Sequence, residues 1–198
     1  MLYLHCVPRL AQVPALIIVN GPPGCGKSAI ARRYVDQHPL ALCLDIDKIR
    51  TMLGCWQRDR GAAGLAARRI ALAAADTHLR AGHDVLIPQF LGRLPFIEQA
   101  EQVAVQAGAT FREVVLMDSK ANSLRRFAER SRATADPAHL DARDHIAGLG
   151  GPDELARMYE LLLEVIAARP GTLIVQTTSG AVDQAYQDFA QCLSDQPG

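Results

Sequence analysis

Short runs of apolar residues alternate along the chain with longer segments in which apolar residues recur every three or four positions. The short runs predict buried strands, and the periodic segments predict amphipathic helices. This alternation is typical of a parallel sheet that is covered by helices on both faces. Five strands are expected, at Ala15–Asn20, Leu40–Leu44, Val85–Pro88, Phe111–Met117 and Thr172–Gln176.

Periodic apolar residues mark the helices between these strands. The segment Ala62–Ala81 is rich in alanine and precedes Gly82, a residue type that commonly ends helices, so a helix is expected there. Its Leu65, Leu72 and Leu79 are expected to pack inward. Three further helical faces are assigned to the core, in 96–107, 155–166 and 182–193.

Two segments interrupt the regular alternation. Gly54–Gly64 is polar and surrounds the only tryptophan, while Ser131–Gly151 is charged and poorly periodic. Irregular segments of this kind serve either as binding loops and lids or as solvated connections. No linker or internal repeat divides the chain, and 198 residues with 49% hydrophobic residues suit a single domain spanning 1–198.

The first expected strand leads into a glycine-rich loop, and a helical pattern resumes directly after it. Closely spaced glycines allow successive backbone N–H groups to point inward around a phosphate at the start of a helix. Lys27 can then reach the β- and γ-phosphate oxygens, and the Ser28 hydroxyl can ligate the magnesium ion that bridges them. The loop therefore predicts ATP and Mg²⁺ as cofactors. The residues expected to bind the nucleotide here are Gly21, Pro22, Pro23, Gly24, Cys25, Gly26, Lys27, Ser28 and Ala29.

Charge and cysteine content narrow the classes of partner. Lysines and arginines number 21, as do aspartates and glutamates, so no overall basic field attracts nucleic acid or anionic lipid, and a small-molecule partner is favoured. A local basic face remains compatible with this balance, and nothing in the pattern indicates an oligomeric state. The five cysteines lack paired metal-binding spacing and indicate reduced thiols in the cytoplasm. No apolar run approaches the roughly 20 residues that span a bilayer, and Met1–Pro14 lacks the features of a secretory signal.

Two carboxylates follow the second expected strand. Asp45 and Asp47 stand where a doubly wound sheet brings its strand ends and the glycine-rich loop to one crevice. One carboxylate there can accept the proton of an acceptor hydroxyl that attacks the γ-phosphate, and the other can hold magnesium through water. Asp47 is the candidate base, and Asp45 is the candidate metal residue. Asp47 is also suited to cap a helix over Lys48–Leu53, a role that is compatible with catalysis.

With these residues in place, the chain resembles the small P-loop kinases grouped with chloramphenicol phosphotransferase, zeta-toxin kinases and the kinase half of polynucleotide kinase, which are related to adenylate and shikimate kinases. The resemblance extends from about Ala15 to Leu193 and rests on a few short features. It implies a three-layer α/β P-loop NTPase fold with a five-stranded parallel sheet and a helical lid at about 131–151. The features are the loop 21–28, the Asp45-x-Asp47 pair, Arg93 after the third strand, and Arg126-x-x-x-Arg130 after the fourth.

In the family that the chain resembles, the aspartate matching Asp47 is the base, and the arginines matching Arg126 and Arg130 begin a mobile lid over ATP. Their four-residue spacing also places both arginines on one face of an expected helix. Guanidinium groups suit the charge on a phosphoryl group in transfer, although a solvated basic face is the simpler interpretation of either arginine alone. Gln89 stands where many relatives carry an aspartate. Either Asp45 assumes that role toward magnesium, or Gln89 hydrogen-bonds the acceptor.

The turn after the last expected strand offers a further contact with the nucleotide. In the resembled kinases the equivalent turn borders the adenine, so Thr177 is assigned to nucleotide binding. Alternatively, Thr178 or Ser179 only caps the helix that follows.

The combined pattern predicts an ATP-dependent phosphotransferase that acts on a hydroxyl group of a small molecule. The acceptor is expected between the Asp45–Asp47 turn, the segment 55–60 and Gln89–Phe90, where Trp56 is available to stack on a ring. Two alternatives remain open: a nucleotide- or nucleic-acid-end kinase, and an ATP-binding regulatory protein, which the neutral Gln89 favours. The first alternative needs a basic groove, for which the candidates are Arg58, Arg60, Arg68 and Arg69.

Overall fold

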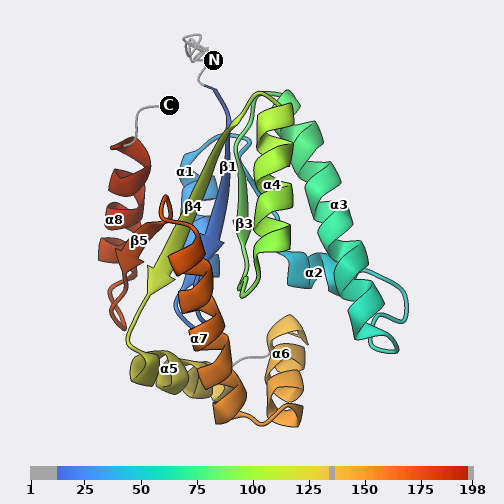
Figure 1. Ribbon diagram of the computed structural model, residues 1–198, viewed down its shortest axis with the longest axis vertical. Coiled ribbons are helices and arrows are strands. Elements are labelled where there is room, and N and C mark those ends of the chain that lie inside the picture. The colour runs from blue at the N-terminus through green and yellow to red at the C-terminus, as the bar shows by residue number, and fades with distance from the viewer. Residues whose placement is uncertain (1–12, 134–136, 196–198) are drawn as a thin grey trace, which may run out of the picture.

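The computed structural model describes residues 13–133 and 137–195, and its strands form one parallel sheet. The strand order is β2-β3-β1-β4-β5. Figure 1 shows α1 and α8 on one face of this sheet and α3 and α4 on the other. Within the described ranges, no helix is both long and apolar enough to cross a membrane. In chain order the elements are β1 (Ala15–Asn20), α1 (Lys27–Gln37), β2 (Leu42–Cys43), α2 (Ile46–Thr51), α3 (Arg60–Arg80), β3 (Val85–Pro88), α4 (Leu94–Gln106), β4 (Thr110–Met117), α5 (Lys120–Ala133), α6 (Pro137–Gly148), α7 (Pro152–Ala168), β5 (Leu173–Gln176) and α8 (Val182–Ser194).

The expected α/β fold class and its five strands are confirmed. β1 and β3 have the expected bounds, and β4 and β5 each differ by one residue at the start. β2 is shorter than expected and contains only Leu42 and Cys43. The preceding Leu40 adopts a left-handed backbone conformation with φ of 63°, which cannot belong to an extended strand. β2 is one of the two edge strands of the sheet and pairs with β3 alone.

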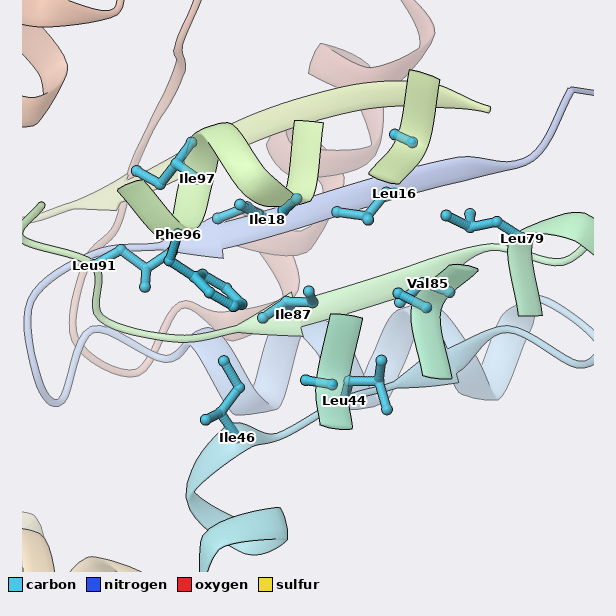
Figure 2. Close-up of a cluster of buried hydrophobic side chains, with 14 of the residues drawn as sticks. Leu16, Ile18, Leu44, Ile46, Leu79, Val85, Ile87, Leu91, Phe96 and Ile97 are labelled. Atoms are coloured by element: carbon cyan, nitrogen blue, oxygen red, sulfur yellow. The ribbon is translucent and has the colours of Figure 1, made fainter. Parts of the chain in front are cut away.

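The central strand buries side chains on both of its faces. In β1, Leu16 and Ile18 pack with α3 and α4, whereas Ile17 and Val19 pack with α1 and α8. Figure 2 shows Ile18 near Phe96 of α4 and Ile87 of β3, and Leu16 further along β1 in the direction of Val85. Because every position of such a strand is covered by helices, the strand appears in the sequence as a continuous apolar run.

One face of α3 is a row of small side chains that packs toward the sheet and α4. Its members are spaced four residues apart. The small side chains allow a close approach, since the distance between packed helices depends on the residues at their contact. The expectation that Leu65 packs inward is wrong, because Leu65 is 60% exposed, whereas Leu72 and Leu79 contact the core. The buried residues are spaced four positions apart from position 63 onward, so Leu65 is not among them. The row consists of four alanines, Ala63, Ala67, Ala71 and Ala75, and it ends in the larger Leu79.

The replacement Gly64→Ala is expected to stabilise the protein. Gly64 lies inside α3, and a Cβ built on it would meet no other atom within 4 Å. Alanine should therefore raise the free energy of unfolding by about 0.5–1 kcal/mol, because it loses less backbone entropy on folding than glycine does. Urea unfolding measures the change. Gly82→Ala is the matched control, since that position is equally open but has φ of 86°, and alanine there should destabilise. A Gly64→Ala protein less stable than wild type would contradict the expectation.

The two segments expected to be irregular differ in structure. Turns occupy the residues 54–58, as expected, but α3 already begins at Arg60. The segment 131–151 contains the helix α6, so the expectation of irregular structure there is wrong, while its role as a lid stays a prediction. Of the described side chains of α6, Asp141 and Ile146 are buried, and one of these two is charged. This explains the poor apolar periodicity. Residues 134–136 of the expected lid lie outside the described residues.

Candidate functional site

The glycine-rich loop lies at the carboxyl end of β1, where its glycines adopt conformations that other residues avoid. Gly21, Gly24 and Gly26 have φ of 143°, 87° and 102°. A Cβ at Gly21 would lie 2.5 Å from the carbonyl oxygen of Leu116 in β4. A Cβ at Gly24 would lie 3.1 Å from the backbone nitrogen of Phe127 in α5. Glycine is thus required at both positions by the backbone conformation and by the close approach of neighbouring elements.

The start of α1 suits an anion. Its N-cap residue, Gly26, supplies no side chain to the N–H groups of the first turn. Uncapped N–H groups at a helix N-terminus attract phosphate oxygens through hydrogen bonds and the helix dipole. Lys27, the first residue of α1, donates through Nζ to the carbonyl oxygens of Gly21 and Pro22, at 2.8 and 2.9 Å. The half-buried Ser28 follows it, so Lys27 and Ser28, which are expected to bind phosphate and magnesium, stand together at one helix end.

A cavity of about 280 Å³ opens beside this loop. Its walls are the loop residues 24–26, Arg126 of α5, and the turn 177–182 that joins β5 to α8. Thr177 is buried there, and both its backbone N–H and its hydroxyl donate to the carbonyl oxygen of Met117, at 2.7 and 3.1 Å. α8 begins at Val182 without a side-chain cap, so the alternative that Thr178 or Ser179 caps this helix is wrong. The turn lines the cavity, and no side chain in it caps α8.

Arg126 is held at the cavity wall by Asp118, a residue that the sequence analysis missed. Asp118 directly follows β4, and its Oδ2 lies 3.0 Å from Nη2 of Arg126. Its Oδ1 accepts hydrogen bonds from the backbone of Ser119 and the side chain of Asn122. The Arg126 side chain is only 10% exposed and lines the cavity, so it does not lie on a solvated helix face. Arg130 lies on the same helix, but its side chain is outside the described residues.

Asp45 caps α2. Its Oδ1 accepts hydrogen bonds from the backbone N–H groups of Asp47 and Lys48, at 3.1 and 3.2 Å. The capping role considered for Asp47 therefore falls to Asp45, and Asp47 lies inside the first helical turn. Burial raises the pKa of Asp45 above its usual value, and the nearby charge of Asp47 acts in the same direction.

Asp47 carries its carboxylate toward the end of β3. Its Oδ2 accepts a hydrogen bond of 3.3 Å from Nε2 of Gln89, which directly follows that strand. Its Oδ1 forms an ion pair of 2.9 Å with Arg50, one turn further along α2. The side chain remains 34% exposed, so a substrate can reach it. Gln89 thus lies beside the candidate base.

A family profile described as an AAA domain matches residues 16–150, which is more than half of the chain. The chain belongs to this family. The chain also matches part of the genome polyprotein of feline calicivirus, with 42% identity over 52 residues. That match covers 24% of this chain and 3% of the polyprotein, so the chain spans only a small part of that relative's length.

Solved structures share the fold of the AAA domain along most of its length. A gluconokinase from Sinorhizobium meliloti 1021 has a TM-score of 0.60 at 16% identity, covering 92% of this chain and 93% of that chain. The APS kinase CysC of Mycobacterium tuberculosis, in complex with AMPPNP and APS, has a TM-score of 0.56 at 18% identity, covering 93% and 99%. The Pnkp1/Rnl/Hen1 RNA repair complex has a TM-score of 0.58 at 16% identity, covering 79% and 46%. The fold is that of the small P-loop kinases, as the resemblance implied.

Asn20 is a second residue of the AAA domain that the sequence analysis missed. It ends β1, is fully buried, and its Oδ1 accepts hydrogen bonds from the backbone N–H groups of Gly21 and Leu91. Its Nδ2 donates to the carbonyl oxygen of Leu91. Asn20 thus ties the phosphate loop to the segment after β3. The signal available in the sequence was a polar residue at the end of an otherwise apolar run. Arg93, one of the resembling features, is an exposed N-cap residue of α4 that makes no side-chain capping bond.

The residues predicted to hold magnesium offer oxygen ligands. Magnesium usually binds through one or two protein oxygens together with substrate phosphates and water. The described residues contain no group of three histidine, cysteine, aspartate or glutamate side chains that could hold a metal ion by themselves. The Ser28 hydroxyl and the Asp45 carboxylate, both of oxygen chemistry, are the groups predicted to serve magnesium.

Proposed function

We propose that the chain is an ATP-dependent phosphotransferase that moves the γ-phosphoryl group to a hydroxyl group of a small molecule. The observation that carries this proposal is the position of the Asp47 carboxylate. It is hydrogen-bonded to Gln89 at the end of β3, the strand that pairs with the loop-bearing β1. A gluconokinase and an APS kinase with bound APS are among the structures of the same fold, which supports a small acceptor.

Each predicted site residue has a role in this proposal. The loop N–H groups bind the phosphates of ATP, and Lys27 exchanges its bonds to Gly21 and Pro22 for bonds to phosphate oxygens. Asp47 orients the acceptor hydroxyl and accepts its proton, and Arg126 and Arg130 bind the phosphoryl group in transfer. Magnesium, held by Ser28 and Asp45, would supply charge neutralisation at the phosphates. Thr177 and its turn border the base of the nucleotide.

A nucleic-acid-end kinase is the second candidate. The RNA repair complex shares the fold, and Arg58, Arg68 and Arg69 are exposed near the acceptor end of α3. Arg60, the fourth arginine of the expected basic groove, is instead paired with Asp141. The groove is therefore less basic than the sequence suggests, which favours the small acceptor.

Magnesium-dependent ATP turnover across a panel of hydroxylated metabolites tests the proposal. Mass spectrometry detects the phosphorylated product, and an oligonucleotide with a free 5′-hydroxyl forms a separate arm. A phosphorylated metabolite supports the proposal, whereas phosphorylation of the oligonucleotide alone supports the second candidate. Tight ATP binding with no phosphorylated product in either arm would instead support the ATP-binding regulatory protein, the alternative that Gln89 favours.

Asp118→Asn is expected to lower kcat by about tenfold, which corresponds to about 1.4 kcal/mol, because Arg126 loses the charge of the carboxylate that holds it at the cavity wall. The amide keeps an oxygen that can still accept from Ser119 and Asn122, so the turn should survive the change. Steady-state kinetics and urea unfolding together separate a loss of positioning from a loss of stability.

Asp76→Asn is the matched control for this change. Asp76 also pairs with an arginine, Arg80, but it lies on α3 and does not line the cavity beside the loop. Wild-type kcat is expected for Asp76→Asn. An Asp118→Asn protein that also turns over at the wild-type rate would show that Asp118 does not position Arg126 for transfer.

A further inference from the structure

A cluster of charged side chains lies on the acceptor side of Asp47, outside the residues assigned to ATP. Arg50 of α2 and Arg60 of α3 both bind the carboxylate of Asp141 on α6. Nη2 of Arg50 lies 3.1 Å from Oδ2 of Asp141, and Nη1 of Arg60 lies 2.5 Å from Oδ1. Each arginine thus takes one carboxylate oxygen. The Asp141 side chain is only 7% exposed, because the arginines enclose it.

The same two arginines lie against the only tryptophan of the chain. Their guanidinium carbons are 5.4 Å and 5.6 Å from the centroid of the Trp56 ring. The Trp56 ring and the Asp141 carboxylate hold the two guanidinium groups close to each other. Because the two cations repel, this arrangement depends on the negative charge of the carboxylate between them. Arg50 also reaches Asp47 through Nη1, at 2.9 Å. The cluster is therefore joined directly to the candidate base.

We propose that Asp141 occupies the place of an acidic group of the acceptor, and that the acceptor is a hydroxyl compound carrying a carboxylate or phosphate group. On binding, this group displaces Asp141 from Arg50 and Arg60. The inference rests on the proposed phosphotransferase function, since it names the acceptor class of that site. Carboxylate and phosphate share the chemistry that matters here, because both present paired anionic oxygens to guanidinium donors.

The burial of the cluster favours an anionic acceptor over a neutral one. The Arg50 side chain is 20% exposed, and removing one partner from a largely buried ion pair leaves an uncompensated charge at high cost. A neutral acceptor that displaced Asp141 would leave the largely buried Arg50 paired with Asp47 alone and would leave Arg60, whose side chain is 39% exposed, without its carboxylate. An anionic acceptor would restore both pairs. Exchange at Nη2 of Arg50 also leaves Nη1 on Asp47, which keeps the bound acceptor next to the base.

Tryptophan fluorescence tests the inference without requiring phosphoryl transfer. Trp56 is the only tryptophan of the chain, so its emission reports on the arginines beside it. The protein is first saturated with AMPPNP, so that added anions do not bind the phosphate loop. It is then titrated with glycerate, glycerol phosphate and glycerol. We expect the two charged compounds to change the emission and the neutral one to leave it unchanged; the stronger of the two identifies a carboxylate or a phosphate.

Asp141→Asn removes the internal competitor and should tighten binding of the charged probe by about tenfold, a factor that corresponds to about 1.4 kcal/mol. Asp144→Asn is the matched control, because that carboxylate lies on the same helix, is exposed, and pairs with Arg143. Arg60→Gln provides a second test that keeps Asp141, and it should weaken binding of the same probe by about tenfold. Arg80→Gln, a change at an exposed arginine at the opposite end of α3, should have no effect.

These outcomes separate the inference from the proposed function. Weaker or unchanged anion binding by Asp141→Asn, unchanged binding by Arg60→Gln, or an equal response to glycerol would each overturn the inference. If Asp141→Asn does not fold, Arg60→Gln alone decides. If no compound of the acceptor panel is phosphorylated, the proposed function is overturned, while the fluorescence titration still decides whether Arg50 and Arg60 bind an anion. Tighter binding in Asp141→Asn together with weaker binding in Arg60→Gln supports the inference.

Discussion

Replacing Asp47 with asparagine is expected to lower kcat by about two to four orders of magnitude while leaving ATP affinity nearly unchanged. The amide keeps the size of the carboxylate but cannot accept the proton of the acceptor hydroxyl. Its contacts with Arg50 and Gln89 lie on the acceptor side, whereas the loop and cavity assigned to ATP are built from other residues. Kinetics with saturating acceptor, combined with calorimetric titration of ATP, separate the two effects.

A second aspartate-to-asparagine change controls for the loss of a negative charge. Asp36 is exposed on α1, away from the acceptor side, and Asp36→Asn should behave as wild type. Because Asp47 also pairs with Arg50, the thermal midpoint of Asp47→Asn is compared with that of wild type. Transfer at the wild-type rate by Asp47→Asn would show that another group accepts the proton.

Lys27→Ala is expected to abolish detectable turnover and to weaken ATP binding by about 10- to 100-fold, the range that follows from losing charge-assisted hydrogen bonds of about 1.5–3 kcal/mol. The ammonium group stands at the start of α1, where it donates to Gly21 and Pro22 and can turn toward phosphate oxygens. Calorimetric titration with AMPPNP measures the affinity without turnover.

The control for this change is Lys48→Ala, which removes an exposed lysine of α2. Wild-type nucleotide affinity is expected for that protein. Since Lys27 also bonds to the loop carbonyls, urea unfolding establishes whether Lys27→Ala retains wild-type stability. Undiminished AMPPNP affinity in a folded Lys27→Ala protein would refute the assignment of the loop.

The sequence pattern predicted the strands of the sheet well, because a strand that is covered on both faces appears in the sequence as a continuous run of apolar residues. β1 and β3 carry unbroken apolar runs that helices cover on both faces, so their bounds matched. Leu40 is apolar as well, yet its left-handed backbone conformation ends the strand pattern there. No local rule distinguishes such a leucine from a strand residue. Likewise, Leu65 has the spacing of a core residue, and only the path of α3 over the sheet exposes it.

The candidate site divides in the same way. The phosphate loop could be predicted because its chemistry is contained in consecutive residues. The ion pair between Arg50 and Asp141 joins positions 91 residues apart, and no spacing rule connects them. Asp118 and Arg126 are closer in the sequence, but a buried aspartate after a strand resembles many turn residues. Contacts of this kind depend on how α5 and α6 pack, which the hydrophobic pattern leaves undetermined.

The row of alanines on α3 has a mechanical consequence for the acceptor site. The helix has 21 residues and is therefore about 31 Å long. It packs against its neighbours through alanine side chains, which have no rotamers with which to make room for added volume. Its first residue, Arg60, is the one that binds Asp141. A larger side chain at position 75 would tilt the whole helix and so displace Arg60, which lies about 20 Å from Ala75 along the helix. Selection for a new acceptor can therefore act on buried alanines that no ligand touches, as well as on the residues of the site.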